Sequence, residues 1–173
     1  MPLLYVLACW VPTTLAAEDA IPAEPEIDAN GSVTVRMVVG ASLEKVHQRL
    51  DSAHEVLDLN PDSRLLSRES HGDCERTHVE TAGLFHPLRY IALRCPTEDG
   101  WHEQLESSPD FKENQSWWHL TSVEGGTEIT YTVQVDLDLP VGDGILAKRV
   151  GESMVSSLQR LADRLYESPV SPL

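Results

Sequence analysis

The stretch that decides the fold is GGTEITYTVQVDLDL, residues 125–139, read together with the residues that follow it. Two glycines open the stretch, and from Glu128 onward polar and apolar side chains alternate. Ile129, Tyr131 and Val133 fall on one face, and threonine, glutamine and aspartate side chains fall on the other. A period of two residues is typical of a strand with one buried face. The pattern therefore predicts a long, half-buried strand that is entered through a tight glycine turn.

A long amphipathic helix is predicted directly after this strand, over residues 142–167. Apolar side chains recur there at helical spacing, and Ser168-Pro169 ends the pattern. A strand and a helix with one apolar face each are stable only when those faces are buried together. The apolar stripe of the helix consists of Leu146, Val150, Met154, Leu158, Leu161 and Leu165.

Upstream of this pair, the chain reads as one strand, two short helices and then further strands. Residues 32–39 alternate like a strand, Ser42 caps a helix over 43–52, and residues 53–59 form a second short helix. Turn signals then separate five strands, expected at 63–70, 74–82, 87–95, 99–108 and 114–123. The prediction is an α+β fold. A bent seven-strand antiparallel sheet surrounds the long C-terminal helix, and two short helices follow the first strand.

This order resembles the START/polyketide-cyclase/coenzyme-Q-binding superfamily (SRPBCC, Bet v 1-like), known for its helix-grip fold. The similarity rests on GGTEITYTVQVDL with the long final helix, and on VVGASLEKVHQRL near the first strand. It covers roughly residues 31–167. The resemblance implies a cavity between sheet and helix that suits a lipid, a quinone or a polyketide-like molecule. It implies no shared catalytic motif.

Aromatic side chains on the predicted strands are the candidates for the wall of such a cavity. Trp117 and Trp118 are adjacent, so they must point to opposite faces of the sheet. The same inward aromatics would also suit an ordinary solid core, and the sequence leaves that alternative open. The candidate cavity-lining residues are Val79, Tyr90, Trp101, Trp117, Tyr131, Met154 and Leu158.

No residue pattern identifies a catalytic or metal site. The seven histidines lack metal-ligand spacing, and neither a GxSxG motif nor a phosphate-binding glycine loop occurs. We therefore assign no catalytic residue, cofactor or metal. Two alternatives to ligand binding stay open. One is a cyclase- or hydrolase-like enzyme that uses a cavity aspartate or histidine as general acid/base. The other is an interaction module without a ligand. The histidines on the sheet and its loops are His78, His86, His102 and His119.

Cys74 and Cys95 begin and end the segment CERTHVETAGLFHPLRYIALRC. If they oppose each other in an antiparallel hairpin, residue numbers of facing pairs sum to 169. That register also pairs Glu75 with Arg94 and Glu80 with Arg89, and opposite charges stabilise such pairs. We predict a disulfide at a non-hydrogen-bonded pair, on the face away from the cavity. A metal site would need a third ligand besides the nearby histidine, and none is evident.

The ends of the chain and its charge bear on location and partners. Residues 1–17 resemble a signal peptide cleaved after Ala16 or Ala17, and the apolar run is too short to span a bilayer. Residues 18–30 read as an acidic linker, 31–168 as the domain and 169–173 as a tail.

A net charge of −15 argues against nucleic-acid partners. The expected protein is periplasmic or secreted and acts as a carrier or sensor of a hydrophobic small molecule. A lipid anchor at Cys9 is the alternative mode of export.

Overall fold

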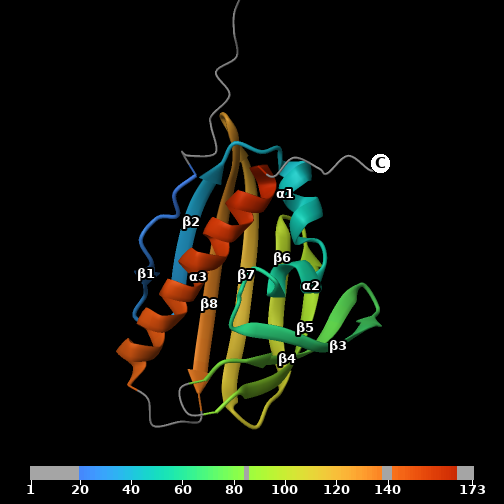
Figure 1. Ribbon diagram of the computed structural model, residues 1–173, viewed down its shortest axis with the longest axis vertical. Helices are drawn as coiled ribbons and strands as arrows, with labels where there is room; N and C mark the ends of the chain where they lie inside the picture. Colours follow the sequence, from blue (N-terminus) through green and yellow to red (C-terminus); the bar gives the residue numbers. More distant parts are fainter. Residues whose placement is uncertain (1–19, 84–85, 138–141, 167–173) are drawn as a thin grey trace, which may run out of the picture.

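The computed structural model describes residues 20–83, 86–137 and 142–166, which form one sheet and three helices on one of its faces (Figure 1). The expected signal peptide, its cleavage site, Cys9 and the tail lie outside the described residues. The strands are β1 (Glu26–Ile27), β2 (Val33–Val39), β3 (Ser63–His71), β4 (Cys74–Thr81), β5 (Leu88–Thr97), β6 (Gly100–Ser107), β7 (Phe111–Val123) and β8 (Gly126–Leu137). The helices are α1 (Leu43–Leu50), α2 (Ala53–Leu57) and α3 (Asp143–Tyr166).

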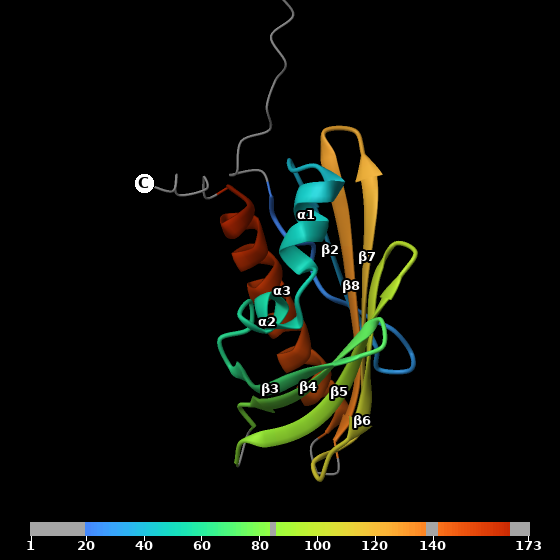
Figure 2. The ribbon, with the colours of Figure 1, turned by 90° about the vertical axis from the view of Figure 1, so that its right-hand side faces the viewer.

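The strands form one antiparallel sheet in the order β1-β2-β8-β7-β6-β5-β4-β3. All seven expected strands are present, and the two-residue β1 adds an eighth at the edge beside β2. The sheet bends strongly, so that β3, β4 and β5 curve around under the helices (Figure 2). The concave face grips α3, which confirms the predicted helix-grip fold.

The glycine turn at Gly125-Gly126 joins β7 to β8. Gly125 has a φ of +87°, a conformation that favours glycine. Next to it, a Cβ on Gly126 would lie 1.9 Å from the carbonyl oxygen of Val39. The two glycines therefore allow the turn and the close approach of β8 to the end of β2.

Helix α1 begins as the sequence predicts and is fastened to the end of α3. The Ser42 side chain accepts a hydrogen bond from the backbone N–H of Lys45. The Lys45 ammonium donates to the carbonyl of Leu165, and the hydroxyl of Tyr166 accepts from the backbone N–H of Gly40. These contacts place α1 beside the C-terminal half of α3, with α3 over β2 and α1 over β7 and β8 (Figures 1 and 2).

The β4–β5 hairpin has the predicted register. Glu75 faces Arg94, and Glu80 faces Arg89. Cys74 and Cys95 form a disulfide with their Cα atoms 4.3 Å apart. The cysteines are bonded to each other, so neither thiolate is available to a metal ion. The prediction of a covalent link across this hairpin is confirmed.

Residues 20–30, which the sequence suggested as a linker, pack along the domain. Ala20 is buried, and the Ala23 N–H donates to the carbonyl of Arg36. The Nη1 of Arg36 also donates to both carboxylate oxygens of Glu26, each at 2.9 Å. The short strand β1 covers part of the free edge of β2. None of the described helices is long and apolar enough to cross a membrane.

The buried apolar side chains fall into two separate clusters. The larger cluster joins α1 and α3 to β2, β6, β7 and β8, with Leu158, Ile129 and Trp118 among its members. The smaller cluster lies on the curved part of the sheet. It comprises Val79, Tyr90 and Ala92, packed against Leu57, Leu105 and Phe111.

Candidate functional site

A cavity lies between the concave face of the sheet and α3, in the region that separates the two apolar clusters. It consists of an outer chamber of about 420 Å³ and an adjoining inner chamber of about 80 Å³. The outer volume alone is within the usual range for small-molecule sites. The residues that line both chambers are Asn60, Ser63, Tyr90, Tyr131, Ser153 and Met154.

The outer chamber has a mainly apolar wall. Phe111 comes from the smaller cluster and Val133 from the larger one, so the chamber lies where the two clusters fail to meet. Its rim is more polar and includes Asp62 and Arg149. The remaining apolar lining consists of Ala82, Leu88, Val135, Leu137, Ile145, Leu146 and Val150.

The inner chamber is polar, and its most unusual group is the carboxyl of Glu103 on β6. Burial raises the pKa of Glu103, and the charge of Arg94 opposes that shift only in part. Within the described part of the chain, the Glu103 side chain has no hydrogen bond and no ion pair within 4 Å. The other residues of this chamber are Val56, Leu57, Ser116, Trp118 and Ser157.

Two tyrosines stand between the chambers. Burial raises the pKa of Tyr90 well above its ordinary value, and the charge of Glu103 adds to this effect. Burial and Glu103 likewise raise the pKa of Tyr131. Hydrogen bonds with Asn114 for Tyr90 and with Ser116 for Tyr131 act in the opposite direction. Both phenols are therefore protonated at neutral pH.

Ring contacts fix the orientation of both tyrosines. Tyr131 stacks on Trp118 with ring centroids 3.9 Å apart, and Tyr90 meets Phe111 edge to face at 5.3 Å. These contacts hold the two rings in place at the junction of the chambers.

Arg94 faces Glu103 in the β5–β6 ladder, yet its guanidinium binds elsewhere. It donates to the carbonyl oxygens of Leu50 at 2.5 Å and Asp51 at 3.1 Å, at the C-terminal end of α1. It also lies 4.6 Å from the ring centroid of Trp101. Burial lowers the pKa of Arg94 to about 10, so it stays charged at neutral pH. Its donors hold α1 in place and leave the Glu103 carboxyl unpaired.

The seven residues proposed from the sequence fall into three groups. Tyr90, Tyr131 and Met154 line the cavity. The structure places the next three in the apolar clusters, away from both chambers: Val79, Trp101 and Leu158.

Trp117 is the seventh and lies on the convex face of the sheet, where its ring stacks on His102 at 5.0 Å. Its neighbour Trp118 is 2 % exposed and lines the inner chamber instead. Alternation along β7 requires opposite faces for the two tryptophans, and the packing of Tyr131 on Trp118 selects which of them points inward.

Glu103 is the cavity residue that sequence reasoning missed. The alternation of β6 did carry a signal, because Glu103 lies between Trp101 and Leu105 on the inward face. Its position alone could not show that the carboxyl lacks a partner. The carboxyl lacks a partner because the Arg94 guanidinium donates to the carbonyl oxygens of Leu50 and Asp51 instead.

None of the four sheet and loop histidines lines either chamber. His102 bonds Gln115 at 3.2 Å, and His119 pairs with Asp99 at 2.9 Å on the surface. His86 is half exposed, and His78 lies on the convex side of β4 with the cysteines. A histidine general base in this cavity therefore has no candidate among the described residues.

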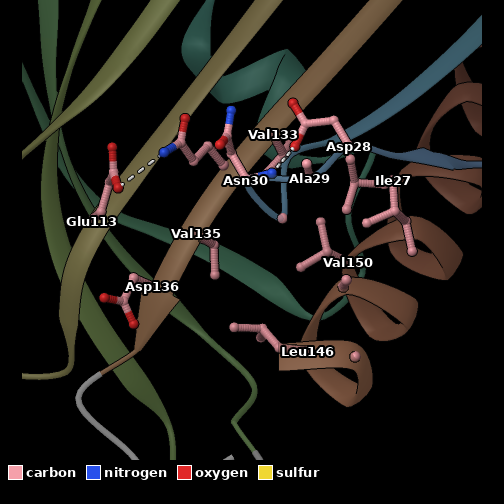
Figure 3. Close-up of a pocket in the computed structure, with 15 residues that line it drawn as sticks. Ile27, Asp28, Ala29, Asn30, Glu113, Val133, Val135, Asp136, Leu146 and Val150 are labelled. Atoms are coloured by element: carbon pink, nitrogen blue, oxygen red, sulfur yellow. Dashed lines mark hydrogen bonds between the residues drawn. The ribbon is translucent and has the colours of Figure 1, made fainter. Parts of the chain in front are cut away.

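A second hollow of about 520 Å³ lies beside the first turns of α3, between the β1–β2 loop and the end of β8 (Figure 3). Two of its three acidic side chains, Asp28 and Glu113, already have partners, and the third, Asp136, is exposed. Asp28 accepts from the N–H groups of Asn30 and Ser32, and Glu113 accepts from Gln115 and Gln134. Because each of these carboxylates is either hydrogen-bonded or exposed to solvent, this groove is a weaker candidate for a ligand site than the cavity with Glu103.

Comparison with known proteins identifies the fold through structure alone. No protein-family model matches the sequence. No curated protein matches it either. Solved structures do match. A START superfamily protein from Mycobacterium smegmatis is 17% identical, with a TM-score of 0.64 over 78% of this chain and 96% of that one.

Two further structures extend this likeness. The Zhui aromatase/cyclase from Streptomyces sp. R1128 is 13% identical, with a TM-score of 0.61 over 77% of this chain and 93% of that one. A STAR-related lipid transfer protein from Xanthomonas axonopodis is 15% identical, with a TM-score of 0.59 over 83% and 98%. At these identities, the comparisons show that the chain has the START-like helix-grip fold.

Proposed function

We propose that this protein binds a hydrophobic small molecule in the cavity between the sheet and α3, as a carrier or sensor. The main support for the proposal is the position of the cavity within the fold. It lies between two apolar clusters and has an apolar outer chamber of about 420 Å³. A ligand with a ring or an alkyl chain would fill this gap and remove its own apolar surface from water.

The solved structures of the same fold support a ligand of this kind. One is named as a STAR-related lipid transfer protein and another as an aromatase/cyclase. Fold likeness alone does not transfer a function, so the cavity of this chain is the main support for the proposal. A lipid, a quinone or a polyketide-like compound would suit the outer chamber.

We also infer that the protein works outside the cytoplasm, in the periplasm or as a secreted protein. The signal-like residues 1–17 support this location, and so does the disulfide between Cys74 and Cys95. Structural disulfides persist in oxidising compartments.

Blocking the cavity tests the proposed binding. Ser153 and Ser156 both lie on α3, but Ser153 lines both chambers and Ser156 is exposed. We expect Ser153→Phe to weaken binding of the neutral fluorophore N-phenyl-1-naphthylamine by at least about tenfold, since the ring would occupy the cavity. Fluorescence titration of delipidated protein measures the affinity, and circular dichroism checks that the variant is folded.

Ser156→Phe is the matched control, because it makes the same change on the exposed side of the same helix. It should bind the fluorophore as wild type does. Absence of saturable binding to wild type would contradict the proposal and favour an interaction module without a ligand. Equal binding by both variants would place the fluorophore outside this cavity.

A further inference from the structure

The inner chamber presents one ionisable group to a ligand, the carboxyl of Glu103. In the ladders, Glu103 faces Arg94 on β5 and Ser116 on β7, so its side chain lies on the concave face of the sheet. No enclosed side-chain oxygen or nitrogen of the described residues lacks a hydrogen-bond partner. Because no hydrogen bond to Glu103 exists there, its carboxyl oxygens must be open to the free space of the chamber.

A half-buried carboxyl that lines a cavity needs a hydrogen-bond donor. Arg94, which faces Glu103 in the ladder, donates its N–H groups to the carbonyl oxygens of Leu50 and Asp51. An unpaired polar group removed from bulk water costs free energy, and water or a ligand donor can offset that cost. The chamber of about 80 Å³ has room for water or for a small head group, but for little more.

We infer that the ligand carries a hydrogen-bond donor, a hydroxyl or an amine, which binds the Glu103 carboxyl while its apolar part fills the outer chamber. This inference rests on the proposed function. A ligand with a carboxylate head group would place a second negative charge beside Glu103, in a site where water screens charges poorly. The chamber therefore selects alcohols and amines over fatty acids.

The groups around Glu103 agree with this selection. The hydroxyls of Tyr90 and Tyr131 stand at the junction of the chambers, and Ser116 and Ser157 line the inner one. Ser157 donates to the carbonyl of Ser153 within α3. Among the residues that line the inner chamber no lysine or arginine is present to receive a carboxylate.

The test compares three ligands that share one alkyl chain: 1-dodecanol, dodecylamine and laurate. Each is titrated at pH 7.5 against bound N-phenyl-1-naphthylamine. We expect wild type to bind the alcohol and the amine at least about tenfold more tightly than laurate. Glu103→Gln should reduce the preference for the amine over laurate by about tenfold or more, because it removes the charge and keeps the shape.

Glu106→Gln is the matched control. Glu106 lies on the same strand but pairs with Arg76 outside the cavity, so wild-type selectivity should be retained. If wild type binds the fluorophore but shows no preference among the three ligands, or if Glu103→Gln leaves the preference unchanged, this inference fails and the proposed function stands. If wild type binds neither the fluorophore nor any of the ligands, both fail.

Discussion

Glu103 and Glu106 lie three residues apart on β6 and face opposite environments. Burial raises the pKa of Glu103. Hydrogen bonds from the Arg76 guanidinium lower the pKa of Glu106, which lies on the convex side of the sheet. Two identical side chains on one strand should therefore respond to pH in opposite directions.

The effect on stability follows from proton binding. The folded state holds the Glu103 proton more tightly than the unfolded state does, so this group's contribution to the free energy of unfolding falls as pH rises above about 4.3. We expect the stability of Glu103→Gln relative to wild type to increase between pH 4 and pH 7.5. Urea unfolding at several pH values within that range measures the difference.

For Glu106→Gln, we expect the difference in stability from wild type to change with pH in the opposite direction. Its lowered pKa gives the wild type a contribution that is present above the unfolded pKa and is lost as pH falls through the folded one. This variant should gain no stability over wild type as pH rises. A Glu103→Gln difference that stays constant with pH would contradict the raised pKa of this carboxyl.

At the scale of elements, the packing of residues 20–30 on α3 depends on one glycine. Gly151 is buried in α3, and a Cβ there would lie 2.9 Å from the Cβ and Cγ atoms of Pro25. The ring of Pro25 has little freedom to move away. The N-terminal segment can lie across α3 only because this position has no side chain.

Gly151→Ala should therefore displace the N-terminal segment and lower the free energy of unfolding by about 1–2 kcal/mol. The displaced segment should become sensitive to a glutamate-specific protease, which would cut after Glu24 or Glu26. Urea unfolding and limited proteolysis followed by mass spectrometry measure the two effects.

Gly144→Ala is the control on the same helix, since a Cβ there meets no atom within 4 Å. It should be at least as stable as wild type, because alanine favours the helix over glycine, and as resistant to the protease. Equal behaviour of both variants would mean that residues 20–30 do not depend on the contact with α3.

At the scale of the whole molecule, the sheet carries a disulfide on its convex face and borders a cavity on its concave face. The disulfide joins β4 and β5 where the sheet curves, while the concave face behind them borders the cavity. The apolar core of this bent sheet is divided into two clusters. We expect the disulfide to add to the free energy of unfolding of such a divided core.

Cys74→Ala combined with Cys95→Ala should lower the free energy of unfolding by about 3 kcal/mol, the chain-entropy value for a loop of this length. Urea unfolding measures the loss. Reducing wild type with dithiothreitol should have a similar effect and should leave the double variant unchanged. A double variant as stable as the oxidised wild type would contradict a structural role, and with it one support for export.

The sequence by itself determined the elements and much of their pairing. Alternation identified seven strands, helical spacing identified α3, and two charged pairs fixed the register in which Cys74 meets Cys95. These features are local or lie within one hairpin, so neighbouring residues carry enough information. The segment 20–30 escaped this reasoning, because its packing depends on Gly151, which is remote in the chain.

Only the tertiary structure decided which side chains form the cavity. Alternation could state that Trp117 and Trp118 oppose each other, but the position of Tyr131 placed Trp118 inside. Glu103 lacks a partner because the end of α1 receives the donors of Arg94. Both outcomes depend on contacts between residues far apart in the sequence, and those contacts form only when the bent sheet closes around its helices.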